Sequence, residues 1–166
     1  MRLGVLGIVL CLPASAQEVD QPRYDAMLDA CYYGAEGPAE QRGCIGLAAQ
    51  SCQSEDGGQT TLGMALCNHA ERMAWDRILN AEYRETLGWA RAMDADEAVS
   101  FPEFAKREEN LRAAQRAWIA FRDAECALDY AVWGAGSMRH IAGTACLARL
   151  TAERTLELAD KTEMMR

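Results

Sequence analysis

The sequence contains few of the residues that build β-sheets. Residues 17–166 include three valines, and no stretch alternates apolar with polar side chains as a half-buried strand does. Alanine, leucine, methionine, glutamate, glutamine and arginine dominate instead, and all of them favour helices. The sequence therefore predicts an all-α fold, built as disulfide-stapled antiparallel helical hairpins in a small helical bundle.

Sequence motifs of enzymes and metal sites are missing as well. The chain has two histidines, His69 and His140, no CxxC pair, no glycine-rich phosphate loop and no Ser-His-Asp order. Carboxylate pairs occur, but a chain with 25 acidic residues contains such pairs by chance. We therefore expect a protein that is not an enzyme and that has no catalytic residue, metal site or cofactor.

The charge balance is acidic, with a formal net charge of −8. Nucleic acids and anionic membrane surfaces attract basic patches, so neither is expected as a partner. An acidic surface is compatible with a basic protein partner, although acidity also serves the solubility of exported proteins in general.

The first 16 residues have the pattern of a signal peptide. Arg2 precedes an apolar run at 3–12, and Pro13 and the small residues 14–16 follow. The run is shorter than the about 20 residues that a membrane-spanning helix needs. We predict cleavage after Ala16 and a periplasmic or secreted protein of net charge −9, since Arg2 is the one charged residue removed. A lipid-modified Cys11 is the alternative, which the preceding Leu10 disfavours.

Six cysteines remain after cleavage, and an even number in an oxidising compartment indicates a disulfide framework. Turn signals lie midway between sequential cysteines, at 36–38, 56–58 and 134–137. When a glycine-containing turn joins two antiparallel helices, residues equidistant from the turn lie opposite each other. The spacing therefore predicts three bonds within hairpins, which are Cys31–Cys44, Cys52–Cys67 and Cys126–Cys146.

Helical segments are expected at 22–34, 39–53, 61–93, 100–133 and from residue 137 to the end of "ELADK" at 161. The fourth begins with the sequence "SFPE", in which Ser100 and Glu103 have the spacing of a capping box. The segment 61–93 has its candidate core positions at Leu66, Ala70, Met73, Leu79, Leu87 and Ala90.

One face of the fourth segment mixes an amide, an indole, a guanidinium and a thiol, from Gln115, Trp118, Arg122 and Cys126. If 61–93 and 100–133 pair as an antiparallel hairpin, residues whose numbers sum to about 194–198 face each other. Arg122 would then reach Asp76 or Glu71, and Gln115 would reach an amide and a phenol. A binding surface is one interpretation, but we favour a structural polar seam between the two helices. Its members are Asp76, Asn80, Tyr83, Gln115, Trp118, Arg122 and Asp123.

The stretches "TTLGMALCNHAERMAWDRILNAEY", "AAQRAWIAFRDAEC", "GAGS" and "CLARLTAERTLEL" together resemble the lysozyme inhibitor LprI-like family of exported bacterial proteins. Phe121 stands where that family usually has tyrosine. The resemblance covers residues 52–158 and implies a small exported helical domain that inhibits lysozyme. We therefore expect an N-terminal helical extension at 17–51 and an LprI-like domain at 52–166, packed as one compact unit. The matching positions are Thr61, Met64, Cys67, Asp76, Leu79, Asn80, Tyr83, Ala114, Gln115, Trp118, Ile119, Arg122, Asp123, Cys126, Ser137, Cys146, Leu147, Leu150, Thr151 and Arg154.

Two non-enzymatic functions remain open from the sequence. The first is inhibition of a lysozyme-type muramidase by protein–protein contact, with the acidic charge attracting a basic lysozyme. The second is an envelope interaction module with a different protein partner. The sequence assigns neither the partner-binding residues nor an oligomeric state.

Overall fold

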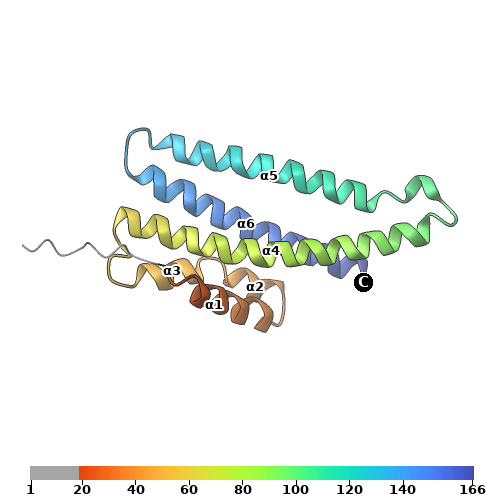
Figure 1. Ribbon diagram of the computed structural model, residues 1–166, viewed down its shortest axis with the longest axis horizontal. Helices are drawn as coiled ribbons and strands as arrows, with labels where there is room; N and C mark the ends of the chain where they lie inside the picture. The colour runs from red at the N-terminus through yellow and green to blue at the C-terminus, as the bar shows by residue number, and fades with distance from the viewer. Residues whose placement is uncertain (1–18) are drawn as a thin grey trace, which may run out of the picture.

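The computed structural model describes residues 19–166, and the predicted signal peptide, residues 1–16, lies outside this part of the chain. Every regular element within the described residues is a helix, as the sequence predicts (Figure 1). In chain order they are α1 (Gln21–Gly34), α2 (Pro38–Gly43), α3 (Leu47–Gln53), α4 (Thr61–Glu97), the short 3₁₀ helix η1 (Pro102–Phe104), α5 (Arg107–Val132) and α6 (Met138–Met165).

The three long helices α4, α5 and α6 form the body of the molecule. The first and last of them run parallel, because Asn68 of α4 donates to Thr144 of α6 at 3.4 Å and Thr86 hydrogen-bonds Thr162 at 2.8 Å. The chain reverses direction in the turn before α5 and again in the turn after it. The α5 helix therefore runs antiparallel to both α4 and α6. Figure 1 shows α5 on one side of the α4–α6 pair and α1–α3 on the other.

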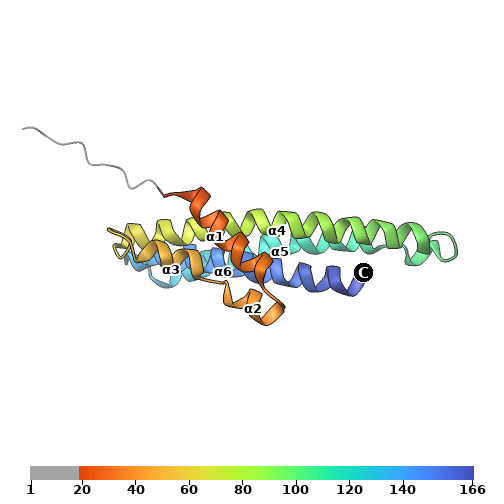
Figure 2. The same cartoon turned by 90° about the horizontal axis from the view of Figure 1, so that it is seen from below.

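The core is densest where the short helices cover the first half of α4. Trp75 is fully buried there, and Tyr24, Leu28 and Tyr32 of α1 pack into the same cluster. Figure 2 shows α1 crossing α4 obliquely, with α2 beside α6. The segment that the sequence marks as an extension therefore supplies aromatic side chains to the main core. A second cluster joins the three long helices through Leu79, Leu87, Ala90, Leu111 and Leu158.

All three disulfides predicted from the turn-centred spacing are present. Cys31–Cys44 joins α1 to the residue that follows α2, Cys52–Cys67 joins α3 to α4, and Cys126–Cys146 joins α5 to α6. Their Cα–Cα distances of 5.9, 5.5 and 5.4 Å lie in the ordinary range for disulfides. The prediction succeeds because each bond closes a local hairpin, whose geometry follows from its own turn.

The predicted single helix at 39–53 is wrong in one respect, because the chain breaks it into α2 and α3. Gly46 precedes α3 with a φ of 92°, in the left-handed region that glycine adopts without strain. The carboxylate of Glu71 on α4 accepts from the backbone N–H of Gly46 at 2.5 Å and of Ala49 at 2.7 Å. A side chain distant in sequence thus caps a helix that its own sequence leaves uncapped.

The predicted capping box at Ser100 and Glu103 is also not formed. Residues 102–104 make a 3₁₀ turn, and α5 begins only at Arg107. The carboxylate of Asp94 on α4 accepts from the backbone N–H of Arg107 at 2.9 Å and of Glu108 at 2.8 Å. The start of α5 is therefore capped by a helix before the loop, a tertiary contact that replaces the local signal.

Two of the three long helices, α4 and α6, extend beyond their predicted C-terminal ends. The α4 helix continues from 93 to Glu97, and α6 continues past 161 to Met165. Arg166 forms ion pairs with Glu85 and Glu163, which tie the last turn of α6 to α4. Met73, expected in the core, is 41% exposed, because the inward positions of that turn are taken by Ala70, Ala74 and Trp75.

Candidate interaction surface

The mixed polar stripe of α5 faces inward, onto α6. Gln115, Trp118 and Arg122 are partly buried, and Cys126 is buried in its disulfide. The Arg122 guanidinium lies over the Trp118 ring at 5.0 Å and pairs with Asp123 at 2.8 Å. The partner of Arg122 is therefore the next residue along the helix, and neither Asp76 nor Glu71 takes that place.

The side chain that completes the stripe comes from α6. Arg154 is 7% exposed, and its Nε donates to the Gln115 amide oxygen at 3.0 Å. Its Nη1 donates to Glu157 at 2.8 Å, and its guanidinium lies 6.0 Å from the Trp118 ring. Trp118 thus contacts two guanidinium groups, one from each helix, an arrangement favoured by the negative face of the indole ring.

The position of Arg154 opposite Trp118 could have been predicted from the sequence, although the predicted polar seam does not include Arg154. Cys126 and Cys146 sit opposite each other across the α5–α6 turn, so positions equidistant from that turn face each other. Applied further along the two helices, the same rule places Arg154 opposite Trp118. The register of the disulfide hairpin predicts the correct polar partner of the α5 stripe, which lies on α6. The register assumed across the longer α4–α5 loop predicts partners on α4 that are not found.

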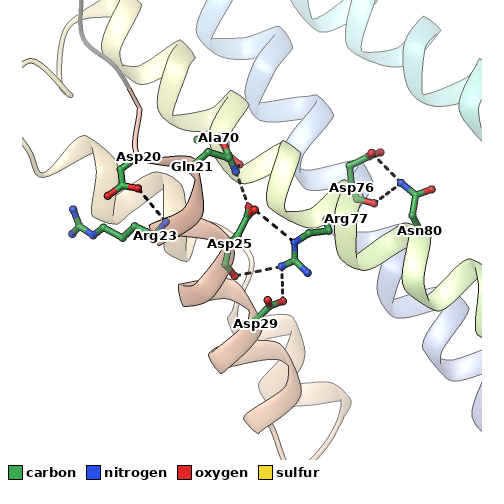
Figure 3. Close-up of polar contacts among 9 residues, drawn as sticks. All are labelled: Asp20, Gln21, Arg23, Asp25, Asp29, Ala70, Asp76, Arg77 and Asn80. Carbon is green, nitrogen blue, oxygen red and sulfur yellow. Dashed lines mark hydrogen bonds and ion pairs between the residues drawn. The ribbon is translucent and has the colours of Figure 1, made fainter.

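The α4 members of the predicted seam do not meet its α5 members through hydrogen bonds. Asn80 donates to the Asp76 carbonyl at 2.8 Å and to its carboxylate at 3.1 Å, so this pair is satisfied within α4 (Figure 3). Tyr83 packs against the cluster where the three long helices meet. Trp118 of α5 packs against the same cluster, so the two halves of the seam meet there through apolar contact. The polar contacts predicted for Arg122 and Gln115 with α4 are not formed, because these side chains pair with Asp123 and Arg154.

Figure 3 also shows how α4 holds the N-terminal helix. Arg77, next to Asp76, pairs with Asp29 of α1 at 2.5 Å and with Asp25 at 3.7 Å. Gln21 adds a hydrogen bond to the carbonyl of Ala70 at 3.0 Å. These contacts fix α1 on the face of α4 that points away from α5.

Shifted pKa values occur away from the exposed side of α5. Burial raises the pKa of Tyr32 and of Glu82, which lie between α1 and α4. Burial and the nearby Arg72 lower the pKa of His69. Burial alone would raise the pKa of Asp94, but its hydrogen bonds from the start of α5 lower it. These shifts accompany structural contacts, and no cluster of three or more His, Cys, Asp or Glu side chains within residues 19–166 could hold a metal ion.

The outer side of α5 is apolar and exposed. Only Leu111 and Cys126 of this helix are buried. Phe121, Leu128 and Val132 share one side by their spacing of seven and four residues, and they are 55%, 59% and 71% exposed. We call these three side chains and the exposed alanines beside them the outer face of α5. These alanines are Ala113, Ala117, Ala120, Ala124, Ala127 and Ala131.

The outer face of α5 presents apolar side chains to solvent over several helical turns. Exposed helices ordinarily carry charged side chains outward, and contiguous apolar patches mark contact sites. Arg116 and Asp123 flank the outer face on one side, and Glu125 flanks it on the other, beside Phe121 and Leu128. The surface is therefore suited to contact with another macromolecule.

Comparison with known proteins identifies the family. The sequence model of the family described as lysozyme inhibitor LprI matches residues 52–158, more than half of the chain. The chain belongs to this family. The matched segment begins at the end of α3 and includes all of α4 and α5 and most of α6, so α1 and α2 lie outside it.

An uncharacterized protein of Rhizobium meliloti (strain 1021) is similar to this chain. It is 34% identical over 102 residues, which cover 61% of this chain and 73% of the relative. No solved structure matches. Among residues 19–166, none of the helices is both long and apolar enough to cross a bilayer. The three disulfides indicate an oxidising compartment.

Proposed function

We propose that this protein is exported to the periplasm or secreted and inhibits a lysozyme-type muramidase by protein–protein contact. The outer face of α5 is the contact surface in this proposal. Membership of the lysozyme inhibitor LprI family supports the inhibitory role. The single structural observation that carries the proposal is an exposed apolar helix face on a disulfide-linked scaffold.

The scaffold suits inhibition because its contact surface is held in place before binding. Cys126–Cys146 fixes one end of α5 to α6, and Asp94 caps its other end from α4. A preorganised surface loses less conformational entropy when it binds, which raises affinity without additional contacts. Phe121 supplies an aromatic side chain of the kind that anchors protein interfaces.

Charge supports the choice of a basic lysozyme as the target. The mature chain carries a net charge of −9 when residues 1–16 are removed. Long-range attraction between an acidic and a cationic protein raises the association rate, whereas the packed contact sets the dissociation rate. The outer face of α5 has little charge of its own, so the acidic remainder of the molecule provides the attraction.

The test is a muramidase activity assay with purified residues 17–166 against c-type and g-type lysozymes. We expect the native chain to inhibit one class, and we expect Leu128→Glu to weaken inhibition at least about tenfold, because it places a charge in the apolar contact. Leu62→Glu is the matched control, since Leu62 is an exposed leucine on α4 that gives the same change in net charge.

Three outcomes separate the parts of the proposal. If Leu128→Glu inhibits as well as the native chain, the outer face of α5 is not the contact surface. Absence of inhibition of both lysozyme classes would overturn the muramidase target. Inhibition lost equally in Leu62→Glu and Leu128→Glu would indicate an effect of overall charge, and the outer face would lose its role.

A further inference from the structure

A groove of about 580 Å³ opens at the end of the bundle where α5 begins and α6 ends. Its volume falls within the range of about 300–1,000 Å³ that is typical of small-molecule sites. In Figure 1 this region lies near the η1 loop and the C-terminus, away from the α5–α6 turn. Its apolar lining consists of Ala90, Phe104, Leu111, Ala114, Met164 and Met165.

The charged lining of the groove is entirely basic, although the protein is acidic. Lys106, Arg107, Arg154 and Lys161 line it, and the described lining contains no carboxylate. Arg107 and Arg154 are paired with acids outside the groove. Lys106 and Lys161 form no ion pair within residues 19–166, so two cationic groups at this groove lack an acidic partner.

A second observation concerns Arg154, whose side chain is 8% exposed. Its Nε and Nη1 have acceptors, but its Nη2 is buried without a hydrogen-bond partner. Gln115 and Glu157 thus hold Arg154 in the wall of the groove, where it adds positive charge, and Lys106 and Lys161 carry the unpaired charge. The groove therefore combines a cationic lining and an apolar wall.

We propose that this groove binds a single-chain amphipathic carboxylate, with its headgroup at Lys106 and Lys161 and its chain along the apolar wall. Charge complementarity selects an anion, and the six apolar side chains select a hydrocarbon body. Met164 and Met165 are flexible side chains that adapt to a chain of varied length. The site is separate from the outer face of α5, so the proposal does not depend on muramidase inhibition.

The test is a titration of the native chain with dodecanoate below its micellar concentration, followed by calorimetry. We expect saturable binding at or below about 1 mM, and at least about tenfold weaker binding of dodecanol and dodecylammonium. Equal binding of the three compounds would overturn the role of the cationic lining. Absence of saturable dodecanoate binding would overturn the proposal as a whole.

Two pairs of variants locate the site. Ala114→Phe fills the groove and should weaken dodecanoate binding at least tenfold, whereas the same change at the adjacent exposed Ala113, outside the groove, should leave it unchanged. Lys161→Glu should weaken binding, and Arg42→Glu on α2 gives the same change in net charge without touching the groove. Equal effects within either pair would place the ligand elsewhere and contradict the assignment.

Discussion

The helices α4 and α5 differ sharply in how much of each is buried. Twelve of the 37 residues of α4 are buried, against two of the 26 residues of α5. The difference arises because α4 is covered by α1 and α3 on one side and by α6 on another, while α5 contacts mainly α6. A helix with one covered side keeps its other side available for contact, but it depends on attachments at its ends.

The difference between the two helices also separates two kinds of stabilisation. The α4 side of the molecule is held by a hydrophobic core around Trp75, where burial of apolar area supplies the free energy. The α5 side is held by one disulfide, a cap from Asp94, the stacked guanidinium groups on Trp118 and the packing of Leu111 in the smaller second cluster. Substitutions should therefore affect the two sides by different mechanisms and by different amounts.

The largest effect is expected in the core of α4. Trp75→Ala removes a fully buried indole and should lower the free energy of unfolding by about 3–5 kcal/mol. Trp133→Ala removes the same side chain just after α5, where it is 47% exposed, and should cost about 1–2 kcal/mol because only about half of the indole is covered. Urea unfolding followed by circular dichroism measures both. Equal losses would mean that the end of α5 is as tightly packed as α4.

A smaller and more local effect is expected from the disulfide of α5. Replacing Cys126 and Cys146 by alanine should cost on the order of 2–4 kcal/mol of stability. The disulfide covalently links the C-terminal half of α5 to α6, where Tyr130 adds contacts with Arg139 and His140. Amide hydrogen exchange in this half should therefore accelerate while exchange in the first half of α4 stays slow. Removal of Cys31 and Cys44 is the matched control and should spare α5. Equal acceleration in α4 and α5 would show that the two helices unfold as one unit.

The smallest effect is expected at the other end of α5. Asp94→Ala removes the carboxylate that caps this helix and should cost about 1 kcal/mol at neutral pH. Asp96→Ala, at an exposed neighbouring position, is the control and should be nearly neutral.

The cap also predicts a pH dependence. Hydrogen bonds lower the pKa of Asp94 in the folded state despite its burial, so its contribution is present above the ordinary aspartate pKa. That contribution is lost as the pH falls through the lowered pKa. The stability difference between the native chain and Asp94→Ala should therefore narrow on acidification from about pH 4 to pH 2. A difference that stays constant over this range would contradict the capping role.

Predictions from the sequence succeeded where the interaction was local. The three disulfides follow from turns within 20 residues, and the all-α class follows from composition. The polar contacts predicted between α4 and α5 are not formed, because α6 packs more closely against each of these helices than they pack against each other. Asn68 and Thr86 instead form hydrogen bonds with residues of α6 that are 73 to 76 positions further along the chain. A local sequence pattern does not predict contacts over such a separation.

The inward direction of the α5 stripe could be read from its spacing, but the identity of its partners could not. Glu71 and Asp94 show the same limit, since each caps a helix that lies on another part of the chain. A capping box or a turn needs only the few residues that form it. A carboxylate that caps from a neighbouring helix needs both helices already packed.

The sequence by itself therefore determined the helical class, the disulfide pairing and membership of the lysozyme inhibitor LprI family. These properties depend on residue composition and on spacings along the chain. Only the tertiary structure decided that α6 is the partner of Gln115 and Trp118, that the outer side of α5 stays uncovered, and that basic residues gather at one groove. Burial and charge proximity are properties of packed helices, because each depends on which distant segment covers a given face.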